Sequence, residues 1–163
     1  MGGLALLGIA GCARSSTATG LFEDAGYAYR VLSSRDRNMI AAVAGTMLEG
    51  ALPADVRPAA LVAVVRGVDV AVAGLPDDPR RELAELFNLL GFSVTRGLTA
   101  GVWSSWSDAS ASDVSAFLSR WRGSSLSLFR SGYQALHQLI MASWYGNGVS
   151  WERIGYPGPP KYN

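Results

Sequence analysis

The stretch that decides the fold is residues 125–145, which read SLSLFRSGYQALHQLIMASWY. Large apolar side chains recur there every three or four residues, which is the spacing of one face of an α-helix. This predicted core stripe consists of Leu128, Phe129, Tyr133, Leu136, Ile140, Met141 and Trp144. Gly146 and Gly148 follow and are typical of a helix end. Because a helix with one apolar face needs other elements to cover it, the stretch predicts a helical bundle.

The chain before this stretch repeats the same periodicity. Ser33 and Ser34 are suitable N-caps for a first helix, and Ser110 with Asp113 has the pattern of a capping box. The predicted helices cover residues 35–48, 56–72, 80–90, 91–101, 110–122 and 125–145. The second is rich in valine, so a strand is the competing interpretation, but its length favours a helix. Residues 74–79 have the composition of a turn. The predicted fold is all-α, a single irregular helical bundle with an extended C-terminal tail rich in proline and aromatic residues.

The composition is that of one domain with an unusually apolar surface. Of the 163 residues, 49% are hydrophobic and only 17% are charged, whereas about a quarter is typical of soluble domains. We expect two contributions, an apolar leader and a surface that a partner covers. The net charge is +1 and no run of Lys or Arg occurs, which argues against nucleic acid as a partner.

Single copies of cysteine and histidine limit the chemistry. Cys12 is the only cysteine and His137 the only histidine. An internal disulfide, a thiolate metal site, a three-histidine zinc site and a C-x-x-C-H haem attachment each need more of these residues and are therefore excluded. His137 lies one helical turn from both Tyr133 and Met141, so a packed core histidine is the favoured interpretation. Ligation of haem by His137 with Met141 or Met47 is the alternative.

The first residues are typical of an export signal. Residues 1–11, MGGLALLGIAG, are apolar, uncharged and too short to cross a membrane. The run Ile9-Ala10-Gly11-Cys12 resembles the bacterial lipoprotein processing box, which predicts lipidation of Cys12; the alternative is an ordinary small residue in a leader. Residues 12–30 are expected to form a flexible tether and residues 31–163 the folded domain. Since a positive n-region is missing, either the true start lies upstream or the signal is degenerate.

No residue pattern predicts an active site in this chain. Asp69, within a valine-rich helix, is expected on the polar face or paired with Arg66 or Arg120; a catalytic acid is the alternative. The run Gly146-Asn147-Gly148 lacks the lysine and the strand of a phosphate loop. No serine occupies a nucleophile elbow. We therefore predict neither catalytic residues, nor a cofactor, nor a metal in this chain.

The C-terminal tail is the most unusual stretch. Its prolines remove backbone donors and favour polyproline II, so we expect side-chain contacts to hold it. Its aromatic residues either pack on the bundle or bind another protein. The triplet Arg120-Trp121-Arg122 is a second candidate for docking an acidic group of a partner; the alternative is that its arginines stack on the indole or pair with carboxylates of the bundle. The predicted partner-binding residues are Arg120, Trp121, Trp144, Tyr145, Trp151, Tyr156, Pro157, Pro159 and Tyr162.

The order of short motifs resembles a known family. A helix from Ser34-Arg35-Asp36-Arg37 leads to LEGALP at 48–53, then to Gly74-Leu75-Pro76 and to FLSRWRGS at 117–124. The chain then closes with WYGN at 144–147 and with Trp151 and IGYPGPP at 154–160. This pattern, over residues 31–163, resembles the small-subunit family related to subunit 3 of gluconate 2-dehydrogenase. The ending IGYPGPP is its most specific part.

The resemblance implies a function for the chain. Members accompany flavin-dependent dehydrogenases of the glucose–methanol–choline class, so FAD is expected in the partner and electrons pass to a cytochrome c subunit or a quinone. The implied role is a non-catalytic small subunit that binds, stabilises and helps export the enzyme, tethered in the periplasm by a lipid. The chain departs from many members by having no arginine pair in its leader, and no functional residue is carried over. The alternative is a stand-alone helical lipoprotein that binds an apolar small molecule.

Overall fold

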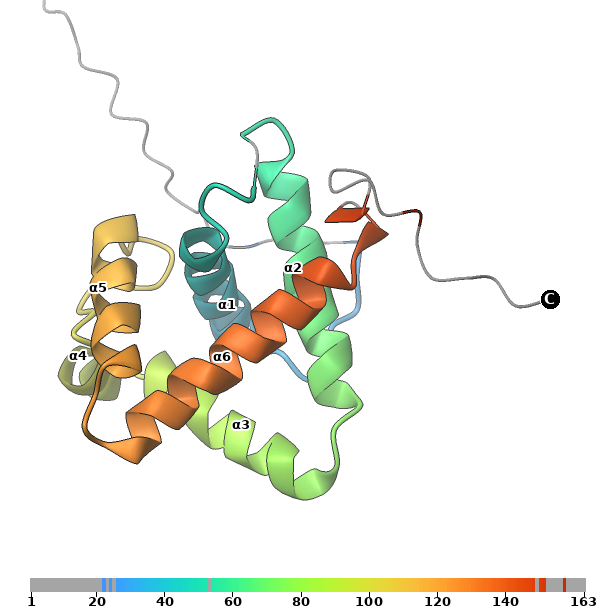
Figure 1. Ribbon diagram of the computed structural model, residues 1–163. Helices are drawn as coiled ribbons and strands as arrows, with labels where there is room; N and C mark the ends of the chain where they lie inside the picture. The colour runs from blue at the N-terminus through green and yellow to red at the C-terminus, as the bar shows by residue number, and fades with distance from the viewer. Residues whose placement is uncertain are drawn as a thin grey trace, which may run out of the picture.

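The computed structural model describes residues 22, 24, 26–52, 54–148, 150–151 and 157, and the regular structure of its long segments is α-helical (Figure 1). The helices are α1 (Ser34–Met47), α2 (Arg57–Ala73), α3 (Asp77–Gly91), α4 (Ser93–Ala100), α5 (Ala111–Arg122) and α6 (Ser127–Tyr145). The predicted all-α class is therefore confirmed. The valine-rich segment is a helix, because its branched side chains find a buried face to fill.

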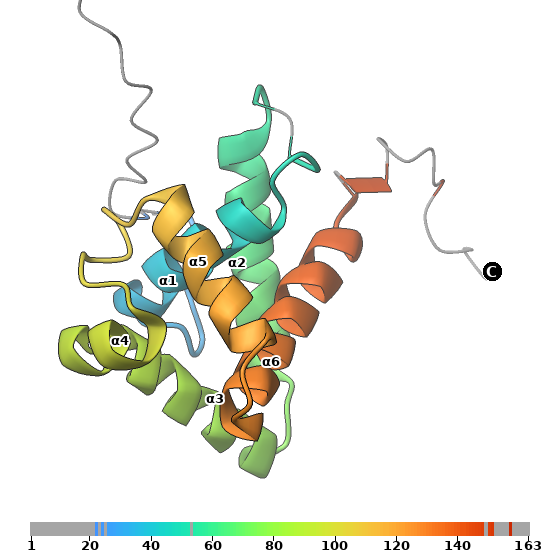
Figure 2. The ribbon, with the colours of Figure 1, turned by 60° about the vertical axis from the view of Figure 1, so that its left-hand side comes forward.

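Helix α1 lies at the centre of the bundle. It contacts α2, α3, α5 and α6, while α6 runs diagonally across α2 and α3 leads directly into α4 (Figures 1 and 2). Fully buried side chains from three helices form the middle of the core: Met39, Ile40 and Val43 of α1, Val64, Val65 and Val68 of α2, and Leu136 and Ile140 of α6. The apolar stripes that the periodicity predicts for these helices thus face one another.

The caps that the sequence predicts are present. Ser33 and Asp36 form a complete capping box at the start of α1, and the Ser110 hydroxyl accepts a hydrogen bond from the backbone N–H of Asp113. Each satisfies a backbone donor that the first helical turn leaves free. Gly146 caps the end of α6, as predicted.

The start of α3 differs from the prediction. The helix begins at Asp77, whereas the sequence predicts a turn through Pro79. Proline is tolerated in the first helical turn because the N–H it lacks has no helical partner there. Asp77 and Asp78 also favour a helix start, since carboxylates interact well with the positive end of the helix dipole.

The predicted start of the helix at residues 91–101 was also wrong, because α4 begins at Ser93. Helix α3 continues to Gly91, and Phe92 adopts an extended conformation with φ −77° and ψ 135° that separates α3 from α4. Gly101 ends α4 with φ +65°, a left-handed conformation that favours glycine. The buried Arg96 side chain fixes both ends of α4, donating to the backbone carbonyls of Gly91 at 3.2 Å and Val102 at 3.0 Å.

Candidate functional site

An open apolar groove of about 780 Å³ lies between α3 and α6. The apolar side chains that line it are Leu75, Pro79, Leu83, Leu86 and Leu89 from α3 and the turn before it, and Leu128, Ala135, Leu139 and Ala142 from α6. Trp121 of α5 also borders it. A solvent-accessible groove of this character on a monomer is a candidate binding site, because water is a poor solvent for its lining.

The groove exists because α6 has two apolar faces. Its core face carries Leu136 and Ile140, which are buried. A second face carries Leu128, Ala135 and Leu139, which share one side of the helix through their spacing of seven and four residues. Leu128 is 70% exposed, so its predicted place in the core stripe was wrong. The apolar period alone does not say which of two adjacent faces the rest of the chain covers.

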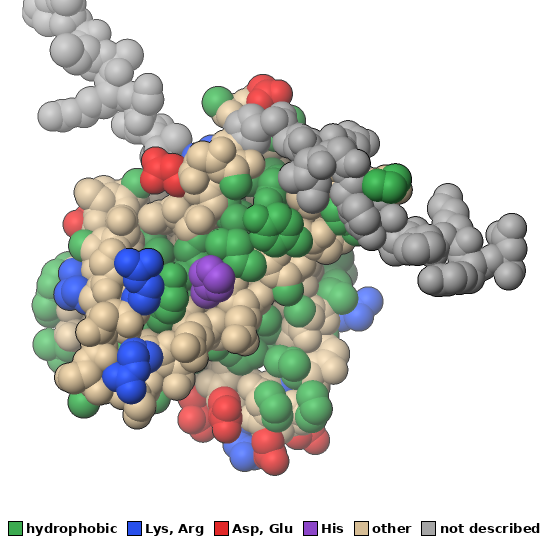
Figure 3. Space-filling model, in the orientation of Figure 1, with side chains coloured by type: hydrophobic (Ala, Val, Ile, Leu, Met, Phe, Trp, Pro, Cys, Tyr) green, Lys and Arg blue, Asp and Glu red, His purple; other side chains and the backbone are tan. Residues whose placement is uncertain are grey.

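The rim of the groove is acidic on the α3 side. Glu82 and Glu85 line it, and neither takes part in an ion pair with another described residue. The aspartates of the first turn of α3 do form local ion pairs, Asp77 with Arg80 and Asp78 with Arg81. Figure 3 shows acidic side chains gathered along the lower edge of this face, over α3. The groove therefore combines an apolar floor with a negative rim.

Two of the predicted partner-binding residues are core residues. Trp121 is 2% exposed and Trp144 is 4% exposed. The indole N–H of Trp121 donates to the Thr99 backbone carbonyl at 2.9 Å, and its ring packs against Phe117 and Phe129. Neither tryptophan presents an exposed indole to a partner, which corrects the prediction for both.

The other predicted partner-binding residues have mixed positions. Arg120 is exposed and donates to the Ala100 carbonyl. Tyr145 is more than half exposed, and its carbonyl accepts a hydrogen bond from the Trp151 indole N–H at 2.6 Å. Pro157 is exposed. The remaining members of that prediction, Tyr156, Pro159 and Tyr162, lie outside the described residues, as does the predicted lipidation site Cys12.

Among the described residues, Asp69 is the most buried charged residue, and backbone amides are its main partners. Its carboxylate accepts hydrogen bonds from the N–H groups of Arg30, Val31 and Leu32 at 2.9–3.0 Å and from the Tyr27 hydroxyl at 3.2 Å. Burial raises the pKa of this carboxyl, but the amide hydrogen bonds outweigh burial and leave the pKa below its ordinary value. Both predicted positions for Asp69, on the polar face or paired with Arg66 or Arg120, were wrong, because the side chain is buried and the segment before α1 supplies its donors. These hydrogen bonds hold the segment before α1 against α2, and we call this arrangement the clamp.

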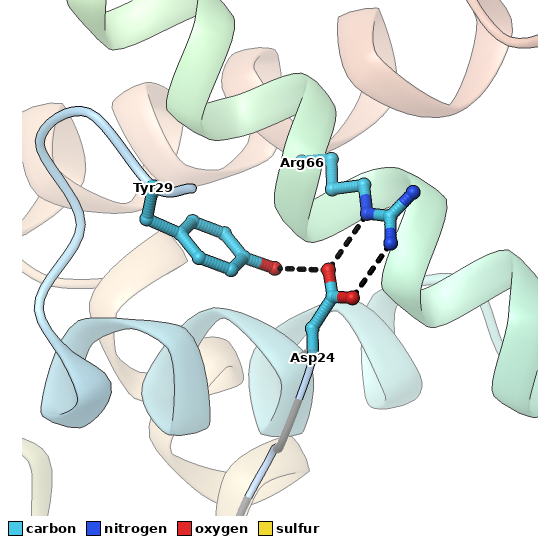
Figure 4. A network of polar contacts seen from close by, with 3 residues as sticks. All are labelled: Asp24, Tyr29 and Arg66. Atoms are coloured by element: carbon cyan, nitrogen blue, oxygen red, sulfur yellow. Dashed lines mark hydrogen bonds and ion pairs between the residues drawn. The ribbon is translucent and has the colours of Figure 1, made fainter. Parts of the chain in front are cut away.

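A second carboxylate adds to the clamp, but here the segment before α1 supplies the carboxylate and α2 supplies the donor (Figure 4). Asp24, from the segment before α1, accepts two hydrogen bonds from the Arg66 guanidinium of α2 at 2.6 and 2.7 Å, and one from the Tyr29 hydroxyl at 3.1 Å. The arginine hydrogen bonds lower the pKa of Asp24. Asp24 and the backbone just before residue 31, which the prediction assigns to a flexible tether, are therefore bound to α2 in the folded domain.

His137 is part of a smaller cleft. Its ring stacks on Tyr133 with centroids 5.8 Å apart, and Met47 and Met141 line the same cleft of about 190 Å³. Within the described part of the chain, no three His, Cys, Asp or Glu side chains gather as a metal-binding group. The favoured interpretation of His137 as a packed residue of α6 agrees with this position, although its side chain is only partly buried.

Comparison with known proteins adds no relative: neither a protein-family model, nor a curated protein, nor a solved structure matches this chain. Among the described residues, every helix is too short or too polar to cross a membrane.

Proposed function

We propose that this chain is a non-catalytic small subunit that binds, stabilises and helps export a flavin-dependent dehydrogenase of the glucose–methanol–choline class. The motifs shared with the gluconate 2-dehydrogenase small-subunit family suggest the class of partner. The observation that carries the proposal is the α3–α6 groove, a continuous apolar surface that the described part of the chain leaves open.

The shape of the groove fits a helix of the partner. Two helices with facing apolar stripes accept a third helix in the way that an amphipathic helix enters a hydrophobic groove. Ala135 and Ala142 are small, so a helix backbone can approach α6 closely. Glu82 and Glu85 on the rim favour a helix with Lys or Arg beside its apolar stripe. The catalytic subunit is thus expected to contribute a basic, amphipathic helix.

The proposed cellular location is based on the first residues of the sequence. Residues 1–11 and Cys12 would direct export and lipidation, so the complex would be tethered to a membrane in the periplasm. FAD belongs to the partner in this proposal, and a cytochrome c subunit or a quinone takes the electrons. Residues 152–163 would extend the contact through Tyr156, Pro159 and Tyr162.

The proposal is tested by purifying the tagged chain from its host and recording the flavin absorbance and the mass spectrum of what accompanies it. We expect a large flavoprotein in near-equal amount. The same purification with Leu128→Asp, which adds a charge to the groove at an exposed position, should lose that flavoprotein. Glu49→Lys, which alters an exposed charge outside the groove lining, is the matched control and should keep it.

A second candidate function has its own supporting observation. The groove volume lies within the range of small-molecule sites, roughly 300–1,000 Å³, and most of its lining is apolar. A stand-alone lipoprotein that binds an apolar small molecule would be recovered without a flavoprotein. Native mass spectrometry would then show an added organic mass that Leu128→Asp reduces.

A further inference from the structure

A second exposed apolar surface, which we call the α4 patch, lies apart from the groove. It consists of Phe92, Val94, Leu98 and Trp103, each more than half exposed, with Leu98 at 73% and Trp103 at 67%. Helix α4 lies at one end of the molecule, away from the first turn of α3 (Figures 1 and 2). Four large apolar side chains at one short helix form a patch that a soluble surface seldom carries without use.

The fold holds the Trp103 ring in its exposed position. Gly101, with its left-handed conformation, reverses the chain after α4 and brings Trp103 back over that helix. The ring then lies against Gly97, where any Cβ atom would overlap it. A glycine inside a helix costs about 1 kcal/mol relative to alanine. The bundle thus accepts that cost while keeping the indole at the surface, which indicates a use for the exposed ring.

Two arginines lie at the edge of the patch, and a third is buried beneath it. The Arg35 guanidinium lies 4.5 Å from the centroid of the Phe92 ring, and Arg120 lies beside Gly101 at the end of α4. Beneath the patch, Arg96 is buried with only backbone carbonyls as hydrogen-bond partners. None of these three arginines forms an ion pair with a described carboxylate. An apolar surface with unneutralised cations at its edge and base is complementary to an anionic surface.

We propose that the α4 patch is a membrane-contact surface that inserts into the interface of an anionic bilayer. Tryptophan is the side chain that favours the headgroup level, and Leu98 and Val94 would reach the acyl boundary beside it. Arg35 and Arg120 would then meet the lipid phosphates. This contact is independent of the proposed dehydrogenase partner, and it would orient the domain on the membrane with the α3 rim turned toward solvent.

The test is flotation of the full chain, carrying Cys12→Ser so that no lipid anchor contributes, with two kinds of vesicle. One kind mixes phosphatidylglycerol and phosphatidylcholine in equal parts, and the other is phosphatidylcholine alone. We expect binding to the anionic vesicles, a loss of about tenfold in affinity for Leu98→Ser because one leucine side chain leaves the lipid, and weaker binding for Arg120→Gln. Leu128→Ser is the matched control, since Leu128 is as exposed as Leu98 but lies in the groove.

Brominated lipids locate the contact independently. They should quench part of the tryptophan fluorescence in the Cys12→Ser chain, and Trp103→Phe should remove that part. The proposal is overturned if the chain fails to bind anionic vesicles, or if the Leu98→Ser and Leu128→Ser chains bind them equally well. It is also overturned if the chain binds neutral vesicles as well as anionic ones and Arg120→Gln leaves the affinity for anionic vesicles unchanged. A Leu98→Ser chain that keeps vesicle binding but loses a co-purifying protein would assign the patch to a protein partner instead and would also overturn it.

Discussion

At the residue scale, two aspartates join the segment before α1 to α2 by reciprocal hydrogen bonds. Asp69 of α2 receives three backbone amides of the segment, and Asp24 of the segment receives the guanidinium of Arg66. An ionised carboxylate is stable in a buried position only when its oxygens are hydrogen-bonded, as these are. Sequence reasoning identified Asp69 as unusual from its valine neighbours. It could not identify the partners, because backbone amides leave no mark in the sequence.

Replacing Asp69 by asparagine should destabilise the protein strongly. Asn keeps the size of the side chain, but it removes the charge and turns an N–H₂ group toward backbone donors. We expect the free energy of unfolding to fall by about 3 kcal/mol, measured by urea unfolding with circular dichroism. Asp78→Asn, which removes an exposed i,i+3 pair with Arg81, should change it by less than about 0.5 kcal/mol. Equal effects of the two substitutions would contradict the clamp.

The same carboxylates predict the pH dependence of stability. The pKa values of Asp24 and Asp69 lie below the ordinary value of 3.8 in the folded protein. On acidification the unfolded chain therefore binds protons before the folded chain does, and stability falls. We expect a constant free energy of unfolding above about pH 5 and a steep decline below about pH 4. Urea titrations should show a shallower decline for Asp69→Asn; an unchanged slope would mean that Asp69 does not titrate differently on folding.

At the element scale, the use of both apolar faces of α6 explains the bundle and its groove. One face packs in the core, and Gly132 lies at the close approach between α6 and the Trp121 ring. The helix, its range and its end are predictable from the apolar period and from Gly146, as the caps of α1 and α5 are from Ser33 and Ser110. The side of α6 that remains open is not predictable in the same way, because the coverage of a face depends on the path of α3.

Gly132→Ala and Gly45→Ala should have opposite effects on stability. A Cβ at Gly132 would lie 2.6 Å from the Trp121 ring, whereas a Cβ at Gly45 would lie 3.4 Å from the Arg57 guanidinium, which is an ordinary van der Waals contact. Alanine favours a helix over glycine by about 1 kcal/mol, so Gly45→Ala is expected to stabilise. Overpacking at Gly132 is expected to cost about 2 kcal/mol. Thermal unfolding measures both, and stabilisation by both would contradict the close packing of Trp121.

At the scale of the whole molecule, the acidic rim of the groove and the cluster of basic side chains lie over different helices. The α3 side carries the acidic rim of the groove, while arginine side chains gather over α5 and the start of α6 (Figure 3). The low charged fraction of the sequence predicts that some surface is covered, and the groove and the α4 patch show where uncovered apolar side chains lie. The predicted site residues Trp121 and Trp144 are buried instead, since tryptophan suits a core as well as an interface.

Reversing the charge of the groove rim should weaken binding of the partner. Glu82→Lys with Glu85→Lys would place like charges opposite the basic helix that we propose. We expect a loss of about tenfold or more in affinity, mainly through slower association and with a reversed dependence on salt. Surface plasmon resonance with the purified partner would measure both rates. Glu49→Lys should behave like the native chain, and an equal loss for all three substitutions would point to net charge rather than to the groove.

The accessory-subunit proposal is tested most directly by the amount of flavin that purifies with the chain. Tagged protein is isolated from its host, and the flavin absorbance band is compared with the quantity of the chain. The proposal predicts a yellow complex in which flavin and chain occur in near-equal amounts and a large flavoprotein is the second component. A colourless protein that purifies alone, from cells that express the dehydrogenase, would contradict it.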